Sequence, residues 1–184
     1  MRMLGIPLLL LLSVLAATTP SMGAAQPGAD RYLGFSFPER IADFIRQDYE
    51  VHPDPRVGAI AVYRKSAKDR LIITLSALHA PRSRKGRVRS ARKQARRELR
   101  AIRDRYEDAY RARWPAELVI PQRPGVEVHQ GVIKVLDEAA NSHYLYLQIY
   151  DYGATRLRVQ VVHPIERSEA PLQVRDFLAA FPFP

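Results

Sequence analysis

Cationic side chains dominate the part of this sequence that could do chemistry. Residues 79–113 hold 14 Lys and Arg residues against four acidic residues, and this excess of +10 equals the net charge of the whole chain. Six of these basic residues recur at helical spacing and are expected to gather on one flank of a helix: Arg89, Lys93, Arg96, Arg97, Arg100 and Arg103. Such a flank can hold phosphate or sulfate groups through charge-assisted hydrogen bonds. These six residues are therefore the candidate anion-binding site.

The same spacing has an energetic cost, because several of these residues stand four positions apart. Each like-charge pair at that spacing destabilises a helix by about 0.2–0.5 kcal/mol. A helix with a purely structural role would be expected to mix its signs, and a bound anion would relieve the repulsion. The alternative of a charged face that is merely solvated stays open at this point.

Tyrosine and arginine residues alternate with apolar residues near the C-terminal end. Residues 143–151 and 155–163 are expected to pair as a β-hairpin around Gly153, with the odd-length loop 152–154. In that register the apolar rows share one face, and the other face carries a candidate binding surface: Tyr144, Tyr146, Tyr150, Arg156 and Arg158. Aromatic and guanidinium groups side by side can stack on a ligand. The same composition is also common on an exposed or helix-covered sheet face.

Motifs of known enzymes are missing from the sequence. There is no cysteine, no Gly-x-Ser-x-Gly elbow, no phosphate-binding loop and no dinucleotide fingerprint. The five histidines lack the spacing of a metal-binding helix or strand. His143 and His163 would lie opposite each other in the hairpin, with Glu127 and His129 on another strand, but such histidines are usually packed or exposed. We therefore expect no catalytic residues, no metal and no cofactor, and a non-catalytic role rather than an enzyme.

The first 25 residues have the pattern of a secretory signal peptide. Arg2 precedes the apolar run 4–17, which is too short to anchor in a bilayer and ends in small residues rather than a basic stop. We place the cleavage after Ala25, which leaves residues 26–184 as a single globular domain. The mature chain is then expected to be periplasmic or secreted, without a membrane anchor and without disulfides.

Hydrophobic periodicity predicts the elements that position these residues. A basic helix is expected over 87–113, ending at Pro115, and a second helix begins near Ser168. Strands are expected at 57–63, 71–78 and 126–136, and in the final hairpin. Residues 35–50 fit either a strand or a helix. The predicted fold class is α+β, an antiparallel sheet of about five to six strands packed with the long basic helix and a C-terminal helix.

The opening of the domain resembles a known group of proteins. The run Phe37-Pro38-Glu39-Arg40-Ile41-Ala42-Asp43-Phe44, followed by Val57-Gly58-Ala59-Ile60-Ala61-Val62-Tyr63, a strand and a long helix, is similar to a family of uncharacterised exported proteobacterial proteins. The order of elements also resembles the PsbP-like α/β/α fold. The resemblance implies a fold and an envelope location, and it transfers no functional residues.

Three classes of function are compatible with these observations. The leading one is an exported, non-catalytic binding or structural protein of the cell envelope, whose partner is an envelope protein or an anionic envelope component. The second is an anion-binding protein that uses the basic helix 87–113 on anionic lipid, lipopolysaccharide or nucleic acid, although export disfavours nucleic acid. An enzyme is the third and least favoured.

Overall fold

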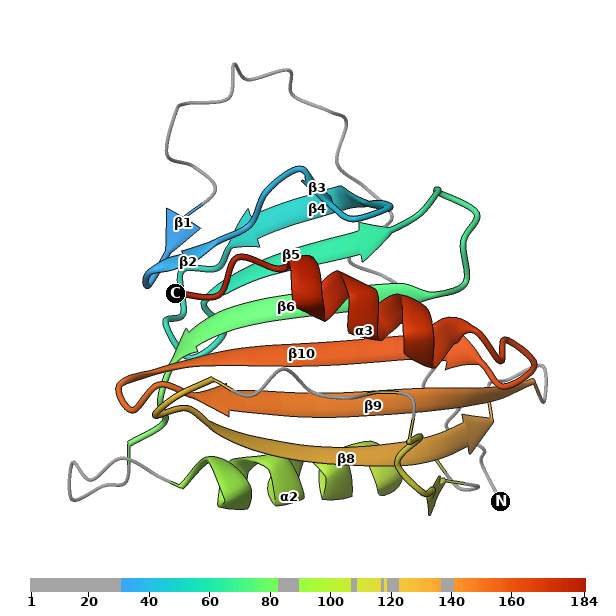
Figure 1. Cartoon of the computed structure of the whole chain (residues 1–184). Helices are drawn as coiled ribbons and strands as arrows, with labels where there is room; N and C mark the ends of the chain where they lie inside the picture. The colour runs from blue at the N-terminus through green and yellow to red at the C-terminus, as the bar shows by residue number, and fades with distance from the viewer. Residues whose placement is uncertain (1–30, 83–89, 107–108, 117, 119–122, 137–140) are drawn as a thin grey trace, which may run out of the picture.

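The computed structural model describes residues 31–82, 90–106, 109–116, 118, 123–136 and 141–184, in which two helices and ten strands are found (Figure 1). The predicted signal peptide, Arg89 and the start of the predicted basic helix lie outside these residues. The strands are β1 (Arg31–Tyr32), β2 (Phe35–Ser36), β3 (Arg40–Ile41), β4 (Phe44–Val51), β5 (Ala59–Arg64), β6 (Ile72–His79), β7 (Tyr110–Arg111), β8 (Glu127–Leu136), β9 (Ser142–Asp151) and β10 (Thr155–Pro164). The helices are α2 (Ala91–Arg103) and α3 (Ala170–Ala180).

Eight of the strands form one antiparallel sheet, in the order β3-β4-β5-β6-β10-β9-β8-β7, and β1 and β2 pair separately. Helix α3 crosses one face of this sheet, and α2 lies on the other side along β8 and β9 (Figure 1). The predicted α+β class with one basic and one C-terminal helix is confirmed, but the strand count was too low. The short strands β3 and β7 at the two edges span two residues each, too few for a visible alternation.

Residues 35–50, which fit a strand or a helix, form strands β2, β3 and β4. Phe37, Ile41 and Phe44 are all buried against the α3 face of the sheet. The chain reverses between β3 and β4 at Ala42, which has a positive φ of 49°, so that Ile41 pairs with Phe44. The reversal places both apolar side chains in the core and leaves Ile45, which a helix would have buried beside them, 37% exposed.

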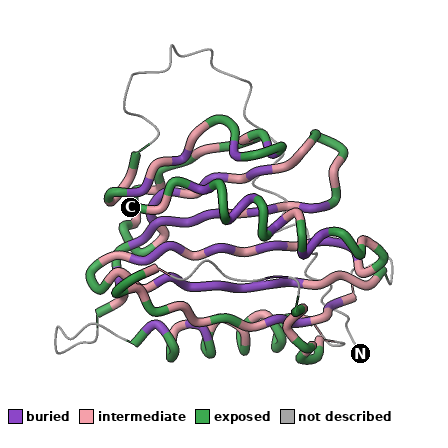
Figure 2. Tube along the Cα trace, viewed as in Figure 1, coloured by how far each residue is buried: buried purple, intermediate pink, exposed green. Residues whose placement is uncertain are grey.

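The main hydrophobic core lies between the sheet and α3. Val174, Phe177 and Leu178 of the helix are fully buried there, against the apolar rows of β5, β6 and β10. The ring of Phe177 packs edge-on against Phe44 and Tyr63, with centroids 5.2 Å apart in both pairs. The central strands are buried along most of their length (Figure 2). On the other side, Ala91 and Ala95 of α2 form a smaller cluster with Ile149, and Leu145, Leu147 and Ile133 are buried on the same sheet face.

The basic helix is shorter at its C-terminal end than the prediction 87–113. It ends at Arg103, and residues 104–106 close it with turn hydrogen bonds. Tyr110 and Arg111 instead pair with β8 as strand β7, opposite Lys134 and Ile133. The extended conformation also lets Trp114 pack on Tyr146 in the core, with ring centroids 5.5 Å apart. This packing and the added strand outweigh the helical periodicity of the sequence.

The final hairpin exists, but its predicted register is wrong by one residue. Asp151 pairs with Arg156 rather than Thr155, so the loop has an even length, and the N–H of Tyr152 donates to the carbonyl of Thr155 at 3.0 Å. An even loop moves every side chain of one strand to the opposite face relative to the other. Consequently Leu157 lies beside Tyr150 on the α3 face, whereas Ile149 lies under α2.

Candidate anion-binding site

Helix α2 carries its charge on every side that does not touch the sheet. Ala91 and Ala95 are buried, and the predicted site residues that the structure describes are all exposed: Lys93, Arg96, Arg97, Arg100 and Arg103. The buried side is made of alanines, so the helix lies close to the sheet. At Gly131 of β8 a Cβ atom would stand 2.3 Å from Cδ1 of Leu99, so this glycine leaves the space that the leucine fills.

Buried polar groups hold α2 on the sheet. The guanidinium of Arg156 is fully buried and donates to Asp151, with an Nε–Oδ1 distance of 3.3 Å, and also to the side-chain oxygen of Gln94 on the helix. Gln94 in turn donates to Glu98 at 2.8 Å. Arg158 extends this network: its Nη1 lies 3.6 Å from Oε2 of Glu98, and its Nη2 donates to the hydroxyl of Ser76 at 3.1 Å. This network links the helix to β6, β9 and β10.

A groove runs between α2 and the edge of the sheet formed by β7 and β8. Its volume is about 690 Å³. We call it the arginine groove, after the four arginines among its lining residues: Arg96, Leu99, Arg100, Arg103, Arg111, Ala112, Gln130, Gly131, Val132 and Ile133. Three of the arginines come from the helix and Arg111 comes from β7, so guanidinium groups stand on both walls.

The charge of the arginine groove is not neutralised by the described residues that line it, because none of them is acidic. Arg103 has an exposed ion pair with Asp104, at 3.3 Å. Within the described ranges, Arg96, Arg100 and Arg111 have no carboxylate at ion-pair distance. Arginine side chains that converge on a concave surface raise the local concentration of anions. The groove can therefore hold a negatively charged ligand.

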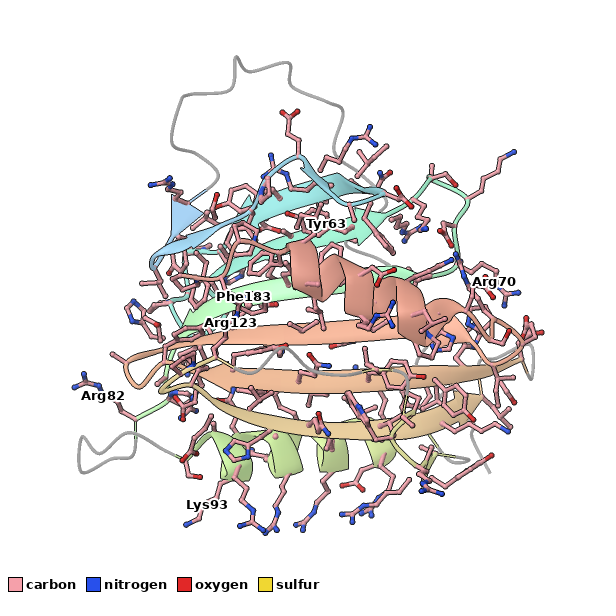
Figure 3. The ribbon with its side chains drawn as sticks, viewed as in Figure 1. Tyr63, Arg70, Arg82, Lys93, Arg123 and Phe183 are labelled. Carbon is pink, nitrogen blue, oxygen red and sulfur yellow. The ribbon has the colours of Figure 1, made fainter. Side chains whose placement is uncertain are left out.

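The predicted basic flank divides between two sides of the helix. Arg97 lines a second groove of about 330 Å³ on the opposite side of α2, together with Arg56, Arg158 and the carboxylate of Glu98. Lys93 extends away from the sheet (Figure 3). Successive helical residues are about 100° apart, which is why Arg96 and Arg97 face different grooves. The structure thus brings together Arg96, Arg100 and Arg103, but it does not place Lys93 and Arg97 with them.

The predicted Tyr/Arg surface is not a single face. Tyr144, Tyr146 and Tyr150 point to the α3 side, where Tyr146 and Tyr150 are buried, whereas Arg156 and Arg158 lie on the α2 side. The even loop of the hairpin separates them. Both sides of β9 are covered. The alternation of Leu and Tyr along this strand therefore did not reveal which row faces α3 and which faces α2. The two arginines hold α2 instead.

Two of these tyrosines take part in buried hydrogen bonds. Burial raises the pKa of Tyr150, whose hydroxyl donates to Oε1 of Gln148 at 3.1 Å. The hydroxyl of Tyr146 lies 3.0 Å from Nε2 of His163, whose Nδ1 is 2.7 Å from the carbonyl of Pro164. A carbonyl only accepts, so Nδ1 carries the proton and Nε2 accepts from Tyr146. Burial lowers the pKa of His163 below its ordinary value.

Histidines do not converge with acidic residues in the part of the chain that the structure describes. No group of three His, Asp or Glu residues there could hold a metal ion. His143 pairs with Pro164 rather than with His163, since the register differs from the predicted one. Nor does any described helix have the length and hydropathy of a membrane span.

Sequence reasoning missed Arg111, Gly131 and Leu99 as parts of the groove. Arg111 was assigned to the helix, although the run Tyr110-Arg111-Ala112-Arg113-Trp114 alternates with a period of two. That alternation is the signal for a strand, with Ala112 and Trp114 packed against the core and both arginines exposed. Gly131 interrupts an otherwise regular strand, which often marks a close approach of another element.

Comparison with known proteins supports the fold. No family model and no curated protein matches this sequence. The solution structure of cyanobacterial PsbP (CyanoP) from Synechocystis sp. PCC 6803 is similar, with a TM-score of 0.51 and 13% sequence identity over 90% of this chain and 96% of that chain. At this identity the likeness concerns the fold alone. The chain therefore has a PsbP-like fold, as the order of its elements implied.

Proposed function

We propose that this protein is an exported, non-catalytic binding protein that holds an anionic ligand in the arginine groove. The observation that carries the proposal is the placement of Arg96, Arg100 and Arg103 on one wall and Arg111 on the other, with no acidic residue among the described lining residues. A charge-assisted hydrogen bond from a guanidinium to a phosphate or sulfate oxygen is about twice as strong as a neutral one.

Repulsion within the helix supports the same function. Arg96 and Arg100 are one turn apart, and such a pair costs about 0.2–0.5 kcal/mol. Arg103 adds a third positive charge on the next turn of the same wall. An anion in the groove lowers the energy of all three groups at once. The basic residues thus have a reason to stand together that a solvated face would not provide.

The chemistry of the lining favours binding over catalysis. Among the described residues around the groove, the polar side chains are four guanidinium groups and the amide of Gln130. A general base or nucleophile needs a carboxylate, imidazole, hydroxyl or thiol within hydrogen-bond reach of the substrate. The N-terminal sequence, with its apolar run and small residues before Ala25, supports export, so an anionic envelope component is the expected partner.

Two matched double variants test this function. Arg96→Gln with Arg100→Gln removes two charges from the arginine groove, while Lys93→Gln with Arg97→Gln removes two charges from the same helix outside it. Both pairs are spaced four residues apart, and Gln is a good helix former. On a heparin column, the first variant should elute at clearly lower salt than the parent and the second close to it, with equal thermal stability. Equal loss in both variants, or no retention of the parent at low salt, would contradict the proposal.

A further inference from the structure

The arginines of the groove form a row rather than a point. Arg96, Arg100 and Arg103 lie on successive turns of α2, so their Cα atoms are spread over about 10 Å along the helix axis at a rise of about 1.5 Å per residue. A single phosphate cannot reach groups that far apart. A chain with several negative charges can contact each of them in turn. The spacing therefore favours a ligand that extends along the helix.

The second wall restricts the shape of that ligand. Arg111 lies opposite Ile133 of β8, and Ala112 beyond it hydrogen-bonds to the carbonyl of Val132 at 3.2 Å, so this wall continues along the edge of the sheet. A ligand that contacts both walls must enter the groove. A bilayer surface is flat and would instead meet the outermost side chains of α2, which include Lys93 (Figure 3).

The floor of the groove discriminates among linear polyanions. The described lining residues include no aromatic ring, and the apolar contacts come from Leu99, Ala112, Val132 and Ile133. Proteins that bind single-stranded nucleic acid stack bases on aromatic side chains, which supply about 1–3 kcal/mol per base. This groove offers charge without stacking. A chain of phosphate or sulfate groups without bases fits it better than a nucleic acid strand.

The geometry points to a linear, base-free polyanion, such as polyphosphate or a sulfated or phosphorylated polysaccharide, bound lengthwise between α2 and the β7–β8 edge. This inference rests on the proposed function, because it specifies the ligand of the same groove. Each phosphate that an arginine neutralises releases counterions. Four contacts would give a slope of about −3 in a plot of log K against log salt, at about −0.7 per contact for a single strand.

Calorimetric titration with a length series tests the inference. Orthophosphate, tripolyphosphate and a long polyphosphate are compared at constant ionic strength, and a heparin oligosaccharide is added to separate phosphate from sulfate chains. Affinity expressed per phosphate group should rise at least about tenfold from orthophosphate to the long chain, which corresponds to about 1.4 kcal/mol. The titration with the long chain is then repeated at several salt concentrations. Arg96→Gln with Arg100→Gln should make the salt slope less negative by about 1.4, and Arg111→Gln by about 0.7.

The other outcomes overturn specific parts of the account. If orthophosphate binds as tightly as the long chain, the groove is a site for a single anion, and the inference fails while the proposed function stands. If single-stranded DNA or anionic vesicles bind more tightly than polyphosphate at equal charge, the ligand is not a base-free linear polyanion and the inference fails. If Arg111→Gln leaves the affinity unchanged, the ligand does not enter the groove. If none of the anions binds, the proposed function itself fails.

Discussion

At the scale of single residues, the carboxylates near an arginine decide what it does in this protein. Arg156 is buried against Asp151 and links α2 to the sheet. Arg56 lies at the surface and pairs with Asp54 two residues away, and the hydrogen bonds from its side chain and backbone lower the pKa of that carboxyl to about 2. In the arginine groove, Arg96 and Arg100 have no such partner among the described residues. Only the last environment leaves guanidinium groups free to bind a ligand.

His163 makes stability depend on pH near neutrality. Its pKa in the folded protein is lowered from 6.5, chiefly by burial, so below pH 6.5 the unfolded chain takes up a proton that the folded chain does not. The stability that the neutral imidazole contributes is therefore present above pH 6.5 and is lost as the pH falls through the folded pKa. Urea unfolding should show a less stable protein at about pH 5.5 than at about pH 7.5, by up to about 1.4 kcal/mol per pH unit.

A pair of substitutions isolates this contribution. His163→Gln should lower stability at neutral pH and flatten its pH dependence, because Gln cannot take up the proton. His79→Gln, at an exposed position at the end of β6, should keep the pH profile of the parent. An unchanged slope in His163→Gln would show that another group causes the pH dependence.

At the scale of elements, α2 is held by a buried polar link as well as by apolar contacts. Its fully buried side chains are two alanines, and Arg156 links Asp151 of the sheet to Gln94 of the helix. The groove depends on this docking, because α2 supplies one of its walls. Removing one partner of a buried ion pair destabilises the protein, because the charge of the other partner stays buried without compensation.

Asp151→Asn should therefore destabilise the protein by about 3 kcal/mol, because it removes the charge that faces the buried guanidinium of Arg156. Asp54→Asn, which breaks an exposed pair, should change stability much less. Denaturant unfolding measures both.

Gln94→Ala should act locally: hydrogen exchange of the α2 amides should become faster while β9 and β10 keep their protection. Uniformly faster exchange, or equal stability of the two Asp variants, would contradict this account of the docking.

The elements were predictable where the residue types or their spacing favour one structure. The strands around Ile60 and Leu75 are confirmed from short runs rich in β-branched and apolar residues, and the C-terminal helix near Ser168 from its apolar face. The prediction failed where both sides are covered, as in β9, because a strand with Leu on one face and Tyr on the other gives no sign of which face lies under which helix. It also failed where tertiary packing overrides a local pattern, as at Trp114, whose contact with Tyr146 draws residues 110–114 away from the helix.

The candidate site was predictable in its charge but not in its shape. The spacing of Arg96, Arg100 and Arg103 placed them on one side of a helix, and the structure agrees. The second wall could not be inferred, because β7 brings Arg111 to the site through a pairing with β8. A groove needs two elements, and the sequence pattern of α2 describes only one.

At the scale of the whole molecule, the sheet divides a large core from a small one. The α3 face contains most of the buried apolar side chains in the described part of the chain, and the α2 face carries the basic helix (Figure 1). The larger core on the α3 side stabilises the fold. Positive charge can therefore gather on the α2 side without disturbing that core. Changes to the exposed arginines of α2 should for that reason affect binding more than stability.

Binding of a polyanion in the arginine groove can be mapped residue by residue by NMR. On titration with tripolyphosphate at low salt, the side-chain Nε–Hε signals of Arg96, Arg100, Arg103 and Arg111 should shift together, along with the backbone amides of residues 130–133, which line the same groove. Arg56, Arg97 and Arg158, which line the smaller groove on the other side of α2, should not shift with them. Shifts that centre on Lys93 or on the smaller groove around Arg97, or shifts that leave Arg111 unaffected, would contradict binding in the arginine groove.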